Sequence, residues 1–415
     1  MGGGGWWQLP LGLLGLVGLI AATVPLADPG IALVPGAVHG GPGWLRGVYG
    51  SGLGIDGDEY YTLLWLAFAA YLCLTVGATA LPPRVVWTAI ALVVVAFALA
   101  PPLLSQDVFS YIDYARLGVV HDLNPYVAVP ADVRADPSFA HLGWATAVSA
   151  YGPLFTLTTY LVGQTSVATA LWVLKALAAA SVLGVAALCA RLAPARGVDP
   201  RRAAVFVALN PLVLVHVVGG AHNDGLMMLL LMASVAYGAA LLERGEGAAL
   251  VGAAAVKTAA IFAAPFALLG ARRRGRLVVA AAVALAAVVT ASLIGFGTHT
   301  LDAAGLVGEN QAATSYYSVP RTMARILDAG LTPVHTVLLV LYGGLVAWLL
   351  FWTWRGGDWV RAAAWAAVGL LVASGWLLPW YLIWALPLAA LVRDRTLTGV
   401  LIALTAFQLV NRIPL

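Results

Sequence analysis

Long apolar stretches separated by short polar ones follow one another along almost the whole chain. A helix that crosses a lipid bilayer needs about 20 apolar residues, and about 11 stretches approach that length. These candidate spans are residues 9–27, 60–80, 85–104, 167–190, 203–219, 225–242, 277–297, 334–353, 362–378, 379–392 and 396–410. The pattern predicts an all-α polytopic membrane protein, with residues 1–415 forming a single transmembrane domain.

The polar connections between these stretches are of two kinds, which indicate the two sides of the membrane. Four short connections are rich in arginine, which is typical of inner loops: residues 191–202, 271–276, 355–361 and 393–395. Two long connections, 28–59 and 105–150, are acid-leaning instead. We therefore expect the arginine-rich connections on the cytoplasmic side and the long connections, including a third at 298–333, on the outside.

Two further apolar stretches cannot be full spans if these sides are correct. Segment 152–164 would bring 191–202 to the wrong side, so we expect a half-helix at the outer membrane surface. Segment 246–270 has basic residues at both ends, which favours a hairpin of two half-helices turning near Thr258–Phe262. Because broken helices are tolerated at membrane depth only where they line a cavity, this hairpin indicates a site.

Composition narrows the class of protein further. The chain is 62% hydrophobic and 10% charged, whereas soluble domains carry roughly 25% charged residues. The net charge of +4 comes from arginine in the short inner connections, so no nucleic-acid partner is expected. Cys73 and Cys189 lie in apolar stretches, which argues against a disulfide framework or a metal–thiolate site. The first apolar stretch lacks the basic start of a signal peptide and is expected to be a span.

A carboxylate, Asp107, follows the third apolar stretch directly. The residues after it have helical spacing, with an apolar face made of Val108, Ile112, Ala115 and Val119. The opposite face carries Asp107, Ser110, Tyr111 and Tyr114. We expect an amphipathic helix on the outer membrane surface, capped by Ser105. Asp107 then either complements the helix dipole or acts as a general base at the edge of the bilayer.

A second polar group, His222-Asn223-Asp224, lies between Gly219-Gly220 and the next apolar run. The loop order places it on the same side as Asp107. Buried polar groups at this depth must be hydrogen-bonded or hydrated. A metal site, a structural polar turn and a sugar or phosphate site remain open, although only His222 and Asp224 could ligate a metal.

The chain has two lysines, and both lie within apolar stretches. Charged residues at such positions are expensive and commonly functional. Lys175, near the outer end of its stretch, can snorkel to the surface. Lys257, at the tip of the predicted hairpin, is better placed to meet an anionic group, with a structural ion pair as the alternative.

Two later segments add candidate binding residues. In 309–327, Arg321 and Arg325 are four residues apart after Pro320, and Tyr316 and Tyr317 precede them. Arginine suits phosphate, but a solvated helix paired with Glu309 or Asp328 is the alternative. In 373–391, Trp376, Trp380 and Tyr381 surround a proline. These aromatic residues form either an interfacial belt or a surface for a sugar or an isoprenoid chain.

Five motifs together are similar to those of a known family. They are "SQDVFSYIDYARLGVVHDLNPY", "YGPLF" at 151–155, "NPLVLVHVVGGAHNDGLMMLLLMAS", the Lys257 hairpin and "LLPWYLIWALPLA". The combination resembles the MptA/MptB-type mannosyltransferases of actinobacteria. That resemblance implies a GT-C fold, with 105–165 as the first catalytic outer loop with its juxtamembrane helices and 298–333 as the second outer loop. High alanine, glycine and arginine usage fits a GC-rich actinobacterial genome.

The resemblance also implies an activity. Members are polyprenol-phosphate-mannose-dependent α-1,6-mannosyltransferases that build the mannan core of lipomannan and lipoarabinomannan. Asp107 matches the catalytic base and His222, Asn223 and Asp224 match the family's polar turn. Arg321 is chosen for the lipid phosphate from its charge and position. Tyr111, Lys257, Tyr317, Trp380 and Tyr381 are further candidates for donor or acceptor binding.

The implied chemistry needs one carboxylate. A β-linked mannosyl phosphate attacked by an acceptor 6-hydroxyl gives an α product with one base, and the phosphate leaving group needs charge stabilisation rather than an acid. We expect no metal and no cofactor. The expected partners are polyprenyl-phosphate-mannose, a lipid-anchored α-1,6-mannan acceptor and membrane lipids, at an extracytoplasmic site of the plasma membrane.

Other functions remain open at this point. A transporter or flippase of a lipid-linked sugar would also be polytopic, but matching broken segments in two related halves would be expected. A GT-C enzyme with another polyprenyl-phosphate sugar fits the same residues. A non-catalytic scaffold would not explain polar groups gathered on one side.

Overall fold

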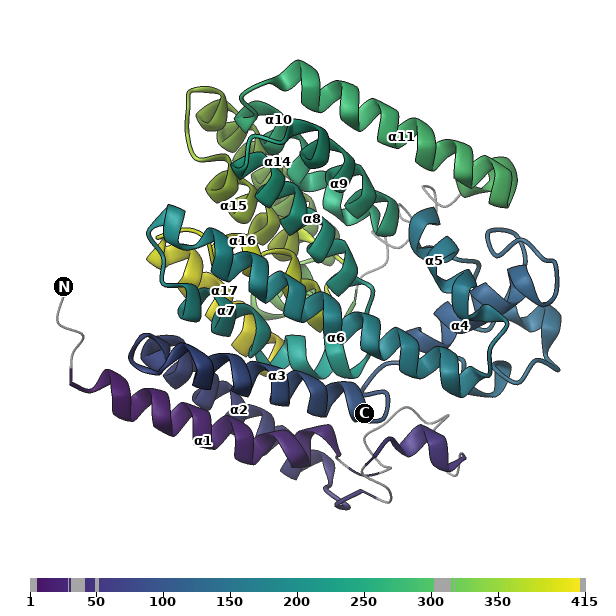
Figure 1. The fold of residues 1–415 in the computed structure, drawn as a ribbon, viewed down its shortest axis with the longest axis horizontal. Helices are drawn as coiled ribbons and strands as arrows, with labels where there is room; N and C mark the ends of the chain where they lie inside the picture. The colour runs from purple at the N-terminus through teal and green to yellow at the C-terminus, as the bar shows by residue number, and fades with distance from the viewer. Residues whose placement is uncertain are drawn as a thin grey trace.

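A computed structural model describes residues 6–28, 30, 42–48, 52–301, 315–316 and 318–410, and all of its regular structure is helical (Figure 1). No β-strand occurs in these residues, and the all-α class is confirmed. The α-helices are α1 (Gln8–Ala27), α2 (Gly57–Gly77), α3 (Pro83–Leu99), α4 (Asp107–Val119), α5 (Pro153–Gly163), α6 (Val167–Leu192), α7 (Pro200–Ala208), α8 (Asp224–Ala239), α9 (Glu243–Val256), α10 (Ala264–Gly270), α11 (Arg274–Phe296), α13 (Val319–Ile326), α14 (Leu331–Trp354), α15 (Trp359–Ala373), α16 (Leu386–Ala389) and α17 (Arg395–Val410).

Tighter and wider helical turns connect several of these elements. The 3₁₀ turns are η3 (Gly43–Arg46), η4 (Ala78–Ala80), η5 (Pro130–Val133), η6 (Phe139–His141), η7 (Pro194–Arg196), η9 (Thr258–Ala263), η10 (Gly297–Leu301) and η11 (Pro379–Trp384). A π-helix, η8 (Val213–Gly219), follows α7. π-Helical turns are rare and frequently occur at functional sites.

The apolar helices support a polytopic membrane protein, although several are shorter than the sequence predicted. Five described helices are long and apolar enough to cross a membrane: α1, α2 extended by η4, α6, α11 extended by η10, and α14. The α7–η8 pair forms a sixth span only if its 66° bend is included. The single span predicted at 379–392 is wrong, because η11 and the four-residue α16 replace it. Pro387 lacks the N–H group that a continuous helix would need in its middle, whereas Pro379 is at the first position, where no N–H is needed.

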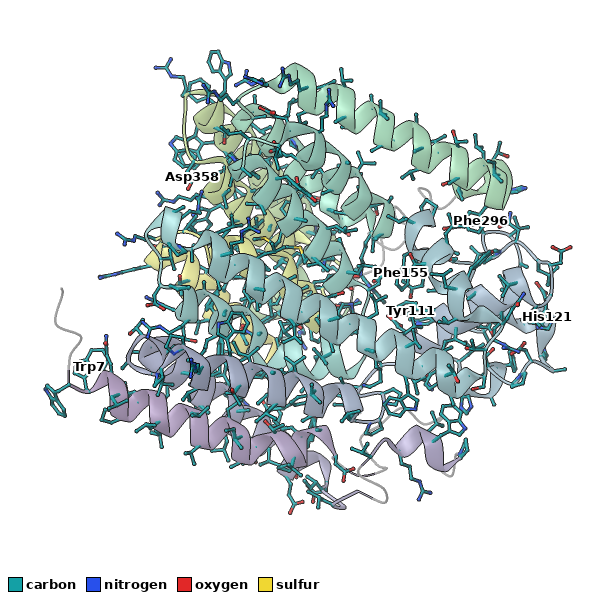
Figure 2. All side chains as sticks on the ribbon, in the orientation of Figure 1. Trp7, Tyr111, His121, Phe155, Phe296 and Asp358 are labelled. Atoms are coloured by element: carbon teal, nitrogen blue, oxygen red, sulfur yellow. The ribbon has the colours of Figure 1, made fainter. Side chains whose placement is uncertain are left out.

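The elements form one bundle whose two ends differ in chemistry. In Figure 1, α1, α2 and α3 lie together along the lower side, α6 crosses the middle and α11 lies along the upper edge. Figure 2 shows Asp358, in an arginine-rich connection, at the left of the bundle and His121, in the long connection after α4, at the right. The predicted inner and outer connections therefore lie toward opposite ends.

Two helices at the edge of the bundle carry broad apolar surfaces. Only 11% of the most apolar part of α11 and 6% of that of α14 is buried by the protein. Leucine and valine side chains dominate the uncovered faces, as in Val283 and Val340. A lipid environment accounts for this exposure, which would be unfavourable in water.

The segment 243–270 enters the bundle and returns to the side from which it came. Gly247 in α9 packs against Leu277 in the first turn of α11, so both helices begin at the same end. The chain leaves α9 at Lys257 in an extended conformation and turns through η9 into α10. This is the arrangement of two half-helices that the charges on either side of the segment predicted.

Helix α4 differs from the prediction of an amphipathic surface helix. Tyr111 and Tyr114, expected on its polar outer face, are buried, as is Asp113. Residues 120–150 fold back over this face: Tyr114 Oη donates to the Ala147 carbonyl, and Ser138 Oγ hydrogen-bonds Asp113. Helical periodicity identifies two faces but does not reveal that a following loop covers one of them.

Candidate active site

Asp107 is the first residue of α4, and its side chain is partly exposed. Leu104 takes a left-handed backbone conformation with φ of 53°, which turns the chain from α3 into α4. Ser105 Oγ accepts a hydrogen bond from the Asp107 backbone N–H at 3.2 Å, but the N-cap position of α4 is held by Gln106, whose side chain makes no capping bond. The expectation that Ser105 caps the helix is therefore wrong. The Asp107 side chain is 19% exposed, so the carboxylate can be reached from outside.

Two side chains face the Asp107 carboxylate. Trp144 Nε1 donates to Oδ1 at 3.2 Å, and His222 Nδ1 lies 3.6 Å from Oδ2. Burial raises the pKa of Asp107; the Trp144 hydrogen bond and the positive charge of Lys257 oppose that rise, and Asp224 adds to it. The protein therefore makes this carboxylate a stronger base than an ordinary aspartate.

The turn between η8 and α8 carries His222. Ala221 has a φ of 56°, so the turn leaves the π-helix sharply and directs His222 toward Asp107. The imidazole stacks on the Trp380 ring with centroids 3.7 Å apart, and its side chain is fully buried. Burial, together with the charges of Lys257 and His216, lowers the pKa of His222 well below its usual value. The imidazole is therefore neutral near pH 7.

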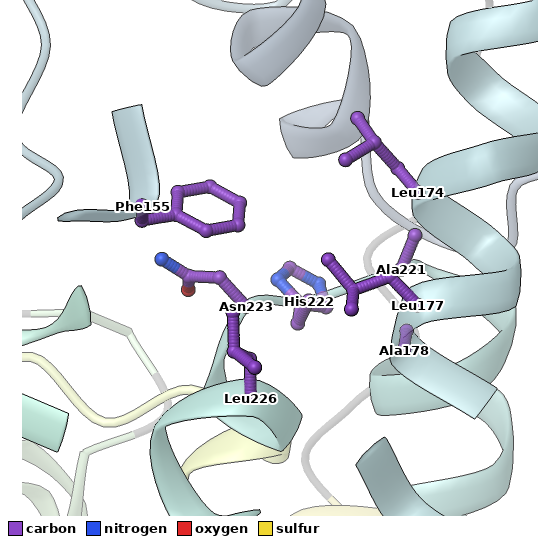
Figure 3. A pocket seen from close by; sticks show the side chains of 8 residues that line it. All are labelled: Phe155, Leu174, Leu177, Ala178, Ala221, His222, Asn223 and Leu226. Atoms are coloured by element: carbon purple, nitrogen blue, oxygen red, sulfur yellow. The ribbon is translucent and has the colours of Figure 1, made fainter. Parts of the chain in front are cut away.

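Asn223 lies beside a small cavity of about 10 Å³ (Figure 3), which is room for roughly one water molecule. Apolar side chains make up most of the rest of the wall: Phe155, Leu174, Leu177, Ala178, Ala221 and Leu226. Within the part of the chain that is described, neither amide atom of Asn223 has a hydrogen-bond partner. These two groups are free to bind a hydroxyl group or a water molecule.

Asp224 and Lys257 form a buried ion pair. Lys257 Nζ lies 2.8 Å from both carboxylate oxygens, and Trp384 Nε1 donates to Oδ1 at 2.6 Å. Asp224 is fully buried, whereas the Lys257 side chain remains 19% exposed. The ion pair, one of two possibilities left open by the sequence, is therefore present, and part of Lys257 is still accessible.

The aromatic residues of η11 line the site. Tyr381 stacks on Trp384 with ring centroids 4.1 Å apart, and Lys257 Nζ lies 4.8 Å from the centre of the Tyr381 ring. Trp380 covers His222. Trp380 and Tyr381 therefore contact the candidate site residues, as the binding-surface hypothesis requires.

Tyr111 and Lys175 are buried residues that pack against, or hydrogen-bond to, segments of the site. Tyr111 is 2% exposed and packs edge-on against Tyr151 and Phe155, with centroids 4.7 and 4.9 Å away (Figure 2 labels Tyr111 and Phe155). Lys175 is completely buried and donates to the Gly219 carbonyl at 2.6 Å. The expectation that Lys175 snorkels to the surface is wrong, because the turn after η8 lies over its ammonium group.

The candidates in the later outer loop are less closely connected to this group. Arg321 lies in the first turn of α13, where its N–H is capped by Ser318 Oγ. In the described ranges its guanidinium makes no hydrogen bond or ion pair with Asp107, Asp224 or Lys257. Tyr317 lies outside the described residues.

The structure adds two residues that sequence reasoning missed, Trp144 and Trp384. Each donates its indole N–H to a site carboxylate. A tryptophan in a membrane protein is ordinarily interpreted as an interfacial anchor, so neither residue stands out in the sequence as a partner of a carboxylate. No three His, Cys, Asp or Glu side chains lie close enough to hold a metal ion in the ranges described.

Comparisons with known proteins agree on one family. A family model described as alpha-(1->6)-mannopyranosyltransferase, N-terminal domain, matches residues 13–273, a range that includes Asp107, the 222–224 turn and Lys257. No solved structure matches the chain significantly.

Two mycobacterial proteins align over most of the chain. Alpha-(1->6)-mannopyranosyltransferase A of Mycobacterium tuberculosis is 30% identical over 90% of this chain and 77% of its own length. A probable alpha-(1->6)-mannopyranosyltransferase of Mycolicibacterium smegmatis is 27% identical over 84% and 72%, respectively. With the family model covering more than half of the residues, the chain belongs to the alpha-(1->6)-mannopyranosyltransferase family.

Proposed function

We propose that the protein is an inverting α-1,6-mannosyltransferase with Asp107 as its general base. The donor is polyprenyl-phosphate-mannose, and the acceptor is the 6-hydroxyl of a lipid-anchored mannan of the lipomannan and lipoarabinomannan core. The observation that carries the proposal is the accessible Asp107 carboxylate, whose pKa is raised by burial and which is held by Trp144. The names of the relatives support the transferred sugar and the linkage.

The reaction is a single displacement. The acceptor O6 attacks C1 of the donor mannose while its proton passes to the Asp107 carboxylate. The bond between C1 and the phosphate oxygen breaks, and its electron pair leaves with the polyprenyl phosphate. A base with a raised pKa is better matched to this proton transfer near neutral pH. Attack from the face opposite the phosphate converts a β-linked donor into an α product.

A lipid-linked donor suits the depth of this carboxylate. Asp107 follows the apolar helix α3 after a short connection, so it lies near the end of an apolar helix of the bundle. A lipid carrier holds its sugar at a comparable depth, next to the headgroups. Trp380 is only partly buried, and the ring face that His222 leaves uncovered supplies a surface on which a sugar ring can pack. Tyr381, buried against Trp384, lies beside it.

The donor phosphate needs a cation besides Lys257. The ammonium group of Lys257 already binds both oxygens of Asp224, and Asp107 adds a second carboxylate to the site. We assign the additional positive charge to Arg321 in the later outer loop, with Tyr317 beside it. Asn223 then belongs to the wall around the reacting sugar. The proposal includes no metal and no cofactor.

The proposed location is the extracytoplasmic side of the plasma membrane, which the arginine-rich connections support because such connections are typical of inner loops. In that arrangement the lipid carrier presents mannose outside the cell, where the acceptor is elongated. A transporter or flippase of lipid-linked sugars and a transferase for another polyprenyl-phosphate sugar are the outcomes that the following experiment separates.

The test is transfer of radiolabelled mannose from polyprenyl-phosphate-mannose to a short α-1,6-mannoside, in membranes carrying wild type or Asp107→Asn. We expect transfer by wild type and a loss of at least about 100-fold in the variant, the usual contribution of a general base. Asp122→Asn is the matched control, because Asp122 is at the surface of the loop after α4, and asparagine tolerates its φ of 55°.

Each outcome has a distinct meaning. Equal activity of Asp107→Asn and wild type would keep the transferase and refute the base. Transfer of another polyprenyl-linked sugar, but not of mannose, would refute the donor. Movement of the lipid-linked sugar across vesicles without any transfer would instead establish the transporter.

A further inference from the structure

We propose that His222 is a positioning residue for Asp107: its Nδ1–H donates to Asp107 Oδ2, and the imidazole does not bind the sugar. This inference rests on the proposed function, in which Asp107 is the base. It gives a definite role to a residue that the sequence placed only within a polar turn.

The geometry around the carboxylate supports one donor for each oxygen. Trp144 Nε1 already donates to Oδ1, and His222 Nδ1 faces Oδ2 at 3.6 Å. This separation is longer than a formed N–H···O bond of about 2.9 Å. Catalytic hydrogen bonds are often long in the unliganded state and shorten when the substrate is bound. Each carboxylate oxygen has two lone pairs, so Asp107 can still accept the proton of the acceptor hydroxyl.

Asp107 and His222 differ in how much of each side chain is exposed, and this indicates different roles. The Asp107 side chain is 19% exposed, whereas that of His222 is fully buried. Trp380 covers the imidazole in a parallel stack with an interplanar angle of 16°. The His222 ring also lines the small cavity beside Asn223, but that cavity of about 10 Å³ has room for one water molecule and not for a sugar ring. A sugar can therefore reach Asp107 without touching His222, and the imidazole then acts on the reaction through the carboxylate.

The charge state of His222 favours a donor over a proton relay. A neutral imidazole carries one ring proton, and the Asp107 carboxylate favours placing it on Nδ1. The other nitrogen, Nε2, then faces Gly220. Because the pKa of His222 is lowered and that of Asp107 is raised, passing the proton from Asp107 to His222 is unfavourable.

Other charged groups act on the same pair and define the controls. Lys257 and Asp224 influence Asp107, and Lys257 and His216 influence His222. A substitution at position 222 leaves Lys257 and Asp224 in place. A change in the titration of Asp107 can therefore be assigned to the lost donor rather than to a lost charge.

Two variants separate the donor from the ring. His222→Asn keeps an N–H group close to the position of Nδ1 but loses the stack on Trp380. His222→Phe keeps a ring of similar size and loses both nitrogen atoms. If position 222 supplies a donor, we expect the asparagine variant to keep kcat within a few-fold of wild type. We expect the phenylalanine variant to lose about tenfold or more, the range for a hydrogen bond to a charged group.

The pH profile gives a second readout. Asp107 is active as the carboxylate, so activity falls as the pH drops through its raised pKa. Losing a donor to the charged form raises that pKa further, so the acid limb of kcat/KM should move up by roughly one pH unit in His222→Phe. It should stay in place in His222→Asn. KM for the donor should not change in either variant.

The opposite order of activities would overturn the proposal. An active phenylalanine variant with an inactive asparagine variant would assign only a stacking role to His222. A raised KM at unchanged kcat would instead make His222 a sugar ligand. If His222→Phe does not fold, His222→Gln replaces it, because its amide lies near the position of Nε2 and away from Asp107.

An infrared titration of the purified protein distinguishes this inference from the proposed function. The carboxyl band of protonated Asp107, identified by its loss in Asp107→Asn, should titrate at a higher pH in His222→Phe than in wild type. If wild type transfers no mannose but the band shifts, the pairing stands and the proposed function is wrong. If wild type is active and the band does not shift, the pairing is wrong.

Discussion

Asp224 is fully buried within the candidate site, and it forms an ion pair with Lys257. Its carboxylate binds Lys257 Nζ with both oxygens and also accepts the Trp384 N–H. Breaking one side of a buried ion pair is costly because the other charge is left unpaired, whereas removing both sides can be nearly neutral. The pair is therefore sensitive to single substitutions.

We expect Lys257→Met to lower the free energy of unfolding by about 3–5 kcal/mol, because it leaves Asp224 buried with only Trp384. The double variant Lys257→Met with Asp224→Asn should recover most of that loss. Thermal unfolding in detergent measures both. A double variant as unstable as the single one would show that packing at Lys257, rather than charge, is responsible.

At the scale of single residues, the sequence points to three charged side chains that the structure brings into one group. Asp107, Asp224 and Lys257 were predicted because charged residues in apolar surroundings need a reason. Their partners Trp144 and Trp384 were not predicted, because the need for an indole N–H is visible only when a carboxylate is seen beside it. The ion pair between Lys257 and Asp224 could likewise be recognised only from the distance between the two side chains.

At the scale of elements, the turn at 219–224 is fixed by hydrogen bonds from two different segments. The Gly219 carbonyl accepts hydrogen bonds from Lys175 Nζ at 2.6 Å and from the Leu103 N–H at 3.3 Å. Leu103 leads into Asp107, and Gly219 leads into His222. One carbonyl therefore sets the relative position of the two segments that carry the base and its proposed donor.

A second close approach joins α5 to the end of α9. Gly152 N–H donates to the Val256 carbonyl at 3.2 Å, and a Cβ at Gly152 would lie 2.1 Å from the Ala255 carbonyl oxygen. Any larger residue must push away the backbone that leads into Lys257.

We therefore expect Gly152→Ala to destabilise the protein by about 1–3 kcal/mol, as overpacking does, and to reduce transfer activity. Gly343→Ala is the control, because a Cβ there meets open space within α14 and alanine favours the helix by up to about 1 kcal/mol. We expect both the melting temperature and the activity to fall in Gly152→Ala. In Gly343→Ala both should stay the same or rise. Equal effects would contradict the close approach.

The predictions for single elements were correct where charged residues at both ends determined the side of the membrane. They were wrong where a covering loop or a proline inside a helix determined the structure. The return of segment 243–270 followed from basic residues at both ends. The burial of α4 did not follow from its sequence, because residues 120–150 cover it through contacts such as Ser138 to Asp113. At 379–392 hydropathy predicted a span, but Pro387 interrupts it in the middle.

Over the whole molecule, the exposed faces of α11 and α14 and the distribution of arginine define a membrane protein with two different sides. The expected number of spans came from counting apolar stretches. Hydropathy does not show where such a stretch bends, however, and α7 and η8 form one apolar stretch that is bent by 66°. The side on which the site opens depends on the arginine-rich connections alone.

Cysteine labelling in intact cells tests that orientation. In a background with Cys73 and Cys189 replaced by alanine, Val127→Cys lies in the connection after α4 and is exposed. Gly275→Cys lies in the arginine-rich start of α11 and faces open space. We expect a membrane-impermeant maleimide to label position 127 in intact cells and position 275 only after permeabilisation. The reverse pattern would put the site in the cytoplasm.

The ion pair between Asp224 and Lys257 also has a consequence for biosynthesis. Its two residues lie on α8 and α9, which leave the ribosome one after the other and pack together. An unpaired charge costs roughly 3 kcal/mol to insert at the centre of a membrane helix. If α8 and α9 enter the bilayer together, each charge is neutralised by the other before any later helix is made. Lys257 would then enter the membrane already paired with the carboxylate of the preceding helix.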